Sequence, residues 1–139
     1  GLTPAGITLP DDRIVSFTSP HGYGQIPNPF IDAEQKMQEL LAGGFRRGTL
    51  LATHDYPAIG ILRAVLAAGL RVPEDVQVIS LCSCQIGGAA PRRLTTVEVH
   101  REENGYQAGC QLLRRIAGDT GPVKELSFLA GELLLGETG

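Results

Sequence analysis

Apolar and polar positions along the chain follow two periods, one typical of strands and one typical of helices. Three short runs, at 49–53, 76–81 and 94–99, are mostly apolar or β-branched and predict strands covered on both faces. A fourth run, at 11–17, predicts a strand that enters a loop at 18–29. The many Gly and Pro residues of that loop exclude regular structure, and a loop of this length is usually functional.

Helical spacing of apolar residues fills the intervals between the predicted strands. The first helix is expected to begin near Asp32, a candidate N-cap, and to stop at Gly43. The second is expected to be capped by Asp55 and to end at Gly69. Strand, helix and strand joined by short loops predict an α/β fold with a parallel sheet flanked by helices.

A third helix is predicted from Arg101 to Gly118, and its apolar residues recur at helical spacing. The tail that follows predicts one or two closing strands interrupted at Gly131. One face of the predicted helix carries four apolar or weakly polar side chains: Tyr106, Cys110, Leu113 and Ile116.

Composition limits the classes of protein that the chain can represent. With 139 residues and 42% apolar content it can bury one core of ordinary domain size. A net charge of -3 offers no general attraction for nucleic acid phosphates. No apolar run approaches the roughly 20 residues of a membrane helix. An odd count of 3 cysteines suits a reducing compartment, so a cytoplasmic location is expected.

Three loops leave predicted strands at their carboxyl ends, where ligands collect in open parallel sheets. They are the loop 18–29, the pair His54-Asp55 and the loop 82–93. No Gly-rich phosphate loop, nucleophile elbow or pair of carboxylates accompanies them. A binding pocket without catalytic residues, metal or cofactor is therefore expected at this edge.

The stretch from Leu51 to Val99 resembles the LacI/GalR family of transcriptional regulators. The usual order there is a strand, an Asn-Asp pair, a helix with Leu-Gly-x-Leu-Arg-Ala, the turn Gly-Leu-x-Val-Pro-x-Asp, a second strand, and a loop closing on Leu-Thr-Thr-Val. The matching segments are His54-Asp55, Ile59-Gly60-Ile61-Leu62-Arg63-Ala64, Gly69-Leu70-Arg71-Val72-Pro73-Glu74-Asp75, Leu94-Thr95-Thr96-Val97 and, in the tail, Gly131-Glu132-Leu133-Leu134-Leu135.

The resemblance implies a fold like that of type I periplasmic binding proteins, in which two α/β subdomains enclose an effector cleft. Residues 1–99 would form the C-terminal subdomain, 101–118 a helix normally packed on the N-terminal subdomain, and 123–139 the closing strands. These residues contain no helix-turn-helix head, so operator DNA would be bound only through a part outside them. A homodimer that senses a small molecule, by family a sugar or related metabolite, is the implied function.

Four side chains are predicted to line the ligand cleft: His54, Asp55, Cys82 and Tyr23. His54 stands where the family places an Asn that bonds effector hydroxyls, although it can instead be a solvated loop residue. Cys82 stands where the family places an Asp, and a thiol is a poor partner for sugar hydroxyls, which argues against a typical sugar. Tyr23 is expected either to stack on the ligand or to lie at a loop tip.

The helix after Asp55 lies in the dimer interface of the family, which predicts contacts through Ile59, Leu62, Arg63 and Leu66. The alternative is that its apolar residues all face the sheet. The helix 101–118 lacks its usual partner, and exposure of its apolar face would cost several kcal/mol. It is therefore expected to fold back or to pair with a second copy.

Other functions remain open at this point. A periplasmic solute-binding protein of an uptake system shares the implied fold. Cys82 and Cys84 could sense oxidation, could bind a soft metal together with His54, or could supply a nucleophile with His54 as base. Arg92 and Arg93 could pair with an acidic effector, although exposed arginines are usually solvated surface.

Overall fold

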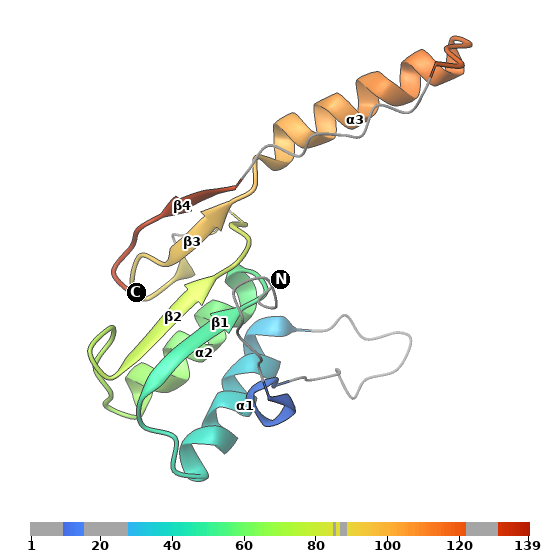
Figure 1. Cartoon of the computed structure of the whole chain (residues 1–139). Helices are drawn as coiled ribbons and strands as arrows, with labels where there is room; N and C mark the ends of the chain where they lie inside the picture. Colours follow the sequence, from blue (N-terminus) through green and yellow to red (C-terminus); the bar gives the residue numbers. More distant parts are fainter. Residues whose placement is uncertain (1–9, 16–27, 85, 87–88, 122–130) are drawn as a thin grey trace.

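The structure is a computed structural model that describes residues 10–15, 28–84, 86, 89–121 and 131–139. It contains a mostly parallel sheet, two helices packed on it and one helix that stands apart (Figure 1). The elements are η2 (Asp11–Arg13), α1 (Pro29–Ala42), β1 (Gly48–Ala52), α2 (Asp55–Ala67), β2 (Val76–Ser80), β3 (Thr95–Glu98), α3 (Arg101–Ile116) and β4 (Glu132–Leu134).

The sheet has the order β1-β2-β3-β4. The first three strands are parallel, with Gly48 opposite Val76 and Ile79 opposite Thr95. The closing strand β4 runs antiparallel to β3. The α/β fold with helices on the sheet is confirmed, with the addition that its last described strand reverses direction.

Two boundaries near the N-terminus differ from the prediction. The strand expected at 11–17 is wrong over its described residues, because Asp11–Arg13 form a turn of 3-10 helix and Ile14 and Val15 belong to no strand. Helix α1 begins at Pro29, before the expected start at Asp32. The side chain of Asn28 accepts a hydrogen bond from the Ile31 amide at 3.4 Å, and a proline suits the first helical position because it lacks an amide proton.

Helix α2 lies against the sheet, and α1 packs closely on α2 (Figure 1). Gly60 of α2 lies at the crossing, where a Cβ atom would lie 2.2 Å from the carbonyl oxygen of Phe30. The side chains of Met37, Leu62 and Val78 are fully buried in the core between the helices and the sheet. The core therefore depends on a glycine that lets the two helix backbones approach.

Helix α3 extends away from the sheet and its covering helices (Figure 1). None of its residues is buried in the described part of the chain, and Tyr106 and Ile116 are 67% and 73% exposed. The chain enters α3 through His100, whose φ of 48° lies in the left-handed region. The expectation that the helix folds back onto this body is wrong, whereas pairing with a second copy stays a prediction.

The C-terminal segment is bound tightly between β2 and β3. Thr138 is 0% exposed, and its hydroxyl donates to the Val78 carbonyl at 2.6 Å and accepts from the Thr95 amide at 3.0 Å. The Val78 amide donates in turn to the Thr138 carbonyl at 2.8 Å. Thr138 therefore pairs with Val78 of β2 and is bonded to Thr95, the first residue of β3. The C-terminal segment in this way links β2 to the start of β3. The part of the predicted tail at 123–130 lies outside the described residues.

None of the helices within the described ranges is long and apolar enough to cross a membrane.

Candidate functional site

The carboxyl ends of β1, β2 and β3 meet at one edge of the sheet, and Asp55 lies at their centre. Its side chain is 4% exposed in total. One carboxylate oxygen accepts a hydrogen bond from the Cys84 amide at 2.6 Å, and the other accepts from the Thr96 hydroxyl at 3.1 Å. One residue at the end of β1 therefore holds both the loop after β2 and the strand β3.

The expected role of Asp55 as the cap of its own helix is corrected by these contacts. The N-cap of α2 is His54, and no side-chain hydrogen bond caps this helix. Asp55 is the first helical residue, and both of its oxygens are directed across the sheet edge. Its negative charge still lies at the positive end of the helix dipole, which favours a carboxylate there.

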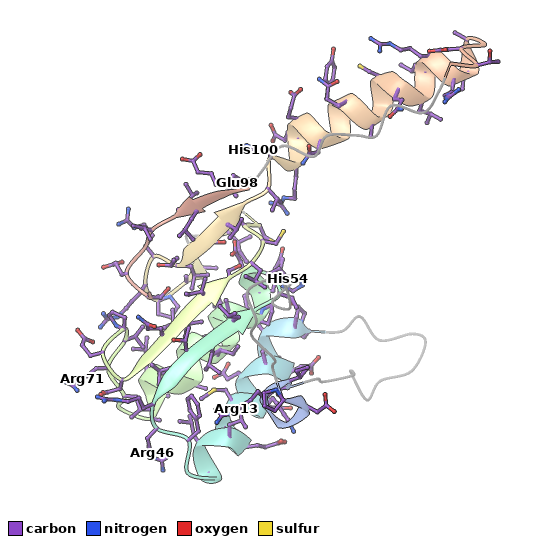
Figure 2. The ribbon with its side chains drawn as sticks, in the orientation of Figure 1. Arg13, Arg46, His54, Arg71, Glu98 and His100 are labelled. Atoms are coloured by element: carbon purple, nitrogen blue, oxygen red, sulfur yellow. The ribbon has the colours of Figure 1, made fainter. Side chains whose placement is uncertain are left out.

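His54 lies at the same edge and is partly exposed. Figure 2 shows it at the end of the sheet opposite Arg71 and Arg46. The ring lies against that of Tyr56 in an edge-on arrangement with centroids 5.8 Å apart. The Nδ1 atom is buried and has no hydrogen-bond partner among the described residues. A buried polar atom without a hydrogen-bond partner costs free energy, so Nδ1 of His54 is a position at which a ligand could supply the missing hydrogen bond.

Cys82, Ser83 and Cys84 form the loop that leaves β2. The Ser83 amide donates to the Val97 carbonyl at 2.8 Å, and the Ser80 hydroxyl donates to the Cys82 carbonyl at 3.2 Å. All three cysteines of the chain are free thiols with partial exposure. Hydrogen bonds to its backbone therefore fix this loop, while its thiols make weak sulfur contacts to described residues.

The thiols of the loop and the ring of His54 do not converge on a common point. Within the ranges that the structure describes, no three His, Cys, Asp or Glu side chains form a group that could hold a metal ion. The soft-metal alternative built on His54, Cys82 and Cys84 is therefore unsupported.

Two predicted contributors do not add to this site. Tyr23 lies outside the described residues. Arg92 is directed at its own chain, since its guanidinium donates to the Val72 carbonyl at 3.1 Å. Arg93 is exposed, as the surface interpretation of the two arginines predicts.

Thr96 is the contributor that the sequence analysis missed. Its position inside the motif Leu-Thr-Thr-Val was visible, but a hydroxyl on a β-branched strand residue carries no sign of a partner 41 residues away. Only the sheet register brings it to Asp55.

The predicted interface residues of α2 divide into two groups. Ile59 and Leu62 are 1% and 0% exposed because they pack inside this chain, so the prediction that they contact a partner is wrong. Arg63 is exposed and lies 3.6 Å from the carboxylate of Glu34 on α1. Leu66 is partly buried at the border of the core. Of the four predicted residues, Arg63 and Leu66 remain available for a partner.

At the opposite end of the sheet, Arg71 and Asp75 close the turn that leads into β2. The guanidinium donates from Nη2 to Oδ1 at 2.7 Å and from Nε to Oδ2 at 2.9 Å. This hydrogen bonding lowers the pKa of the Asp75 carboxyl well below its ordinary value and raises the pKa of Arg71. The pair fixes the entry of β2 and is remote from the candidate site.

Comparison with known proteins connects this architecture to a family. The sequence profile described as "Periplasmic binding protein-like domain" matches residues 20–138. The HTH-type transcriptional repressor MelR of Bacillus subtilis is 32% identical over 122 residues, which are 83% of this chain and 35% of that protein. The chain thus spans about a third of the length of this relative.

Two solved structures have the same fold. A LacI family transcriptional regulator from Arthrobacter sp. FB24, in complex with lactose, superposes with a TM-score of 0.69 at 28% identity, over 78% of this chain and 41% of its own. The lac repressor dimer bound to operator superposes with a TM-score of 0.68 at 25% identity, over 78% of this chain and 32% of its own. These relatives are regulators rather than enzymes, as expected for this chain.

Proposed function

Because this chain belongs to the periplasmic binding protein-like family, in the form of the effector-binding domain of LacI-type regulators, we propose that it senses a small molecule for such a regulator. The observation that carries the proposal is the convergence of His54, Asp55 and the loop 82–84 at the carboxyl edge of the sheet. Ligands bind at this edge in open α/β sheets, where loops and helix ends meet. No covalent chemistry is required of these residues.

The proposed ligand is a sugar or a related hydroxyl-rich metabolite. The unpartnered Nδ1 of His54 can donate to or accept from a hydroxyl group, which would remove the cost of its burial. The similar regulator from Arthrobacter was solved with lactose, and this supports a sugar. Asp55 would contribute indirectly, because both of its oxygens already hold the loop and β3 in position.

The regulatory step would be a shift between two arrangements of the whole regulator. A ligand changes such an equilibrium only by binding one arrangement more tightly. The site is joined to β3 through Asp55 and Thr96, and β3 continues through His100 into α3. Ligand contacts at the sheet edge therefore have a direct structural route to the helix that leaves this body.

The apolar face of α3 would pack on the N-terminal subdomain of the same regulator. That part lies outside these residues, as does the DNA-binding head through which the operator would be bound. The exposed side chains of Tyr106, Leu113 and Ile116 fit such a covered surface. A homodimer would use α2, with Arg63 and Leu66 as the available contacts, and the regulator would act in the cytoplasm.

Thermal unfolding of the full chain in lactose tests the proposed binding. A ligand at a hundredfold excess over its Kd stabilises the native state by about 2.7 kcal/mol, which raises the Tm by several degrees. The shift is expected to disappear in His54→Ala. It is expected to remain in Arg47→Ala, a control at an exposed residue just before β1, at the opposite end of the sheet.

A shift that persists in His54→Ala would contradict the proposed site. If lactose has no effect, the same measurement with monosaccharides, sugar phosphates and nucleosides follows. Absence of a shift across that panel would contradict the sugar-like ligand.

A further inference from the structure

Cys82 and Cys84 flank Ser83 in the loop that leaves β2. Both cysteines are partly exposed, whereas Ser83 between them is buried at 6% exposure. The Ser83 amide is held by the Val97 carbonyl at 2.8 Å. The thiol of Cys84 is folded back toward Cys82, since its sulfur lies 3.9 Å from the Cys82 carbonyl oxygen. Two partly exposed cysteines, separated by one residue, therefore lie at the sheet edge.

We propose that Cys82 and Cys84 form a reversible dithiol–disulfide pair, so that the loop at the candidate site is a redox modification site. Residues two apart in a chain have a Cα separation of about 5.5–7 Å, which overlaps the roughly 4.4–6.8 Å found for disulfides. Among the described residues, the contacts of the two sulfurs are weak, at 3.9 and 4.0 Å to carbonyl oxygens of the same loop. No strong interaction has to be broken before the two sulfurs can join.

The oxidant is a low-molecular-weight disulfide. One thiol loses its proton, and its thiolate attacks a sulfur of the oxidant, which breaks the disulfide bond and releases one thiolate. The second cysteine then loses its proton and attacks the mixed disulfide, which forms the Cys82–Cys84 bond and releases the other half of the oxidant. The two cysteines lose two electrons and two protons in total, and the oxidant becomes two thiols.

The modification changes the backbone next to the hydrogen bond that holds the loop to Asp55. The Cys84 amide donates to Asp55 at 2.6 Å, and Asp55 also holds Thr96 of β3. A disulfide closed over a single intervening residue bends the backbone on both sides of Ser83. The proposal therefore includes a weakening of the bond between the Cys84 amide and Asp55 in the oxidised protein.

Mass spectrometry tests the pair on the full chain with Cys110→Ser, which removes the third thiol. Trypsin releases both cysteines in one peptide, because cleavage follows Arg71 and Arg92. After incubation in mixtures of oxidised and reduced glutathione, this peptide is expected to lose two hydrogens and to resist alkylation. A reducing agent is expected to restore both. Cys84→Ser in the same background should retain one glutathione adduct instead.

Three results would overturn the pair: full alkylation of both thiols at every glutathione ratio, glutathione adducts without loss of two hydrogens, or disulfide-linked dimers. Amide hydrogen exchange then tests the coupling to Asp55. Exchange at Cys84 is expected to be at least tenfold faster in the oxidised protein, with the amides of α1 as the unchanged reference. Equal exchange in the two states would contradict the coupling.

Discussion

The carboxylate of Asp55 accepts a hydrogen bond from the hydroxyl of Thr96 at 3.1 Å, between residues 41 positions apart in the chain. Asp55 begins α2 directly after β1, whereas Thr96 lies in β3 on the far side of β2. The second carboxylate oxygen binds the Cys84 amide in the loop between β2 and β3. A single buried side chain therefore joins the start of α2, the loop after β2 and strand β3 at the candidate site.

Replacement of Asp55 by Ala is expected to destabilise the protein by about 2–4 kcal/mol. The change removes two hydrogen bonds to a charged group and leaves the Cys84 amide without its partner. Urea unfolding measures the loss. Asp32→Ala in the first turn of α1 is the matched control, with an expected cost of at most about 1 kcal/mol. Equal losses in the two variants would show that the sheet-edge contacts contribute nothing beyond the helix dipole.

Thr138→Val tests the bonds that hold the C-terminal segment. The substitution keeps the shape of the side chain but removes its bonds to Thr95 and Val78, in a position that is 0% exposed. A loss of about 2–3 kcal/mol in urea unfolding is expected, because a buried amide and a buried carbonyl each lose a partner. Thr49→Val is the control, because it removes a hydrogen bond to Gln77 that is exposed to solvent. The free energy of unfolding is expected to change by less than about 0.5 kcal/mol in this variant. The idea fails if the two variants are equally stable.

Gly60→Ala is expected to destabilise the protein, although Ala normally favours a helix over Gly by about 1 kcal/mol. The new methyl group would lie 2.2 Å from the Phe30 carbonyl, so α1 and α2 must separate at a cost of about 3 kcal/mol. Gly105→Ala in α3 is the control, because nothing lies within 4 Å of its Cβ position. That variant should raise the helical circular dichroism signal. A stabilising Gly60→Ala would contradict the close crossing.

The ion pair of Arg71 and Asp75 is expected to stabilise the fold at neutral pH and to lose this effect in acid. The pKa of Asp75 is lowered by hydrogen bonding to Arg71, so the folded protein keeps this carboxylate charged when the unfolded chain has already bound a proton. The contribution is complete above the ordinary carboxyl pKa of about 4 and declines as the pH falls below it.

The Tm difference between the native sequence and Asp75→Asn, measured from pH 7 to pH 2, should therefore be positive at neutral pH and shrink below about pH 4. High salt should reduce it, since the pair is exposed to solvent. Glu74→Gln controls for the removal of one negative charge from the same turn. A difference that grows as the pH falls would have the wrong sign for this pair.

The sequence by itself determined the order of strands and helices from α1 onward, and the family. Strand and helix periods are local properties, and the motifs between Leu51 and Val99 are long enough to identify the fold without any knowledge of contacts. The edge of the sheet at which His54 and Cys82 lie also followed from the order of elements, because parallel strands bring their carboxyl ends together.

The tertiary structure decided which of several possible contacts each of these residues makes. Asp55 had the sequence pattern of a helix cap, yet its oxygens are used by Cys84 and Thr96, which the register of the sheet brings within reach. Ile59 and Leu62 were expected in a dimer interface from the family resemblance, yet both are buried within this chain, where α2 packs against α1 and the sheet. Periodicity states which side chains share a face of a helix, but not which other element covers that face. That choice depends on contacts between segments far apart in the chain, which no local pattern contains.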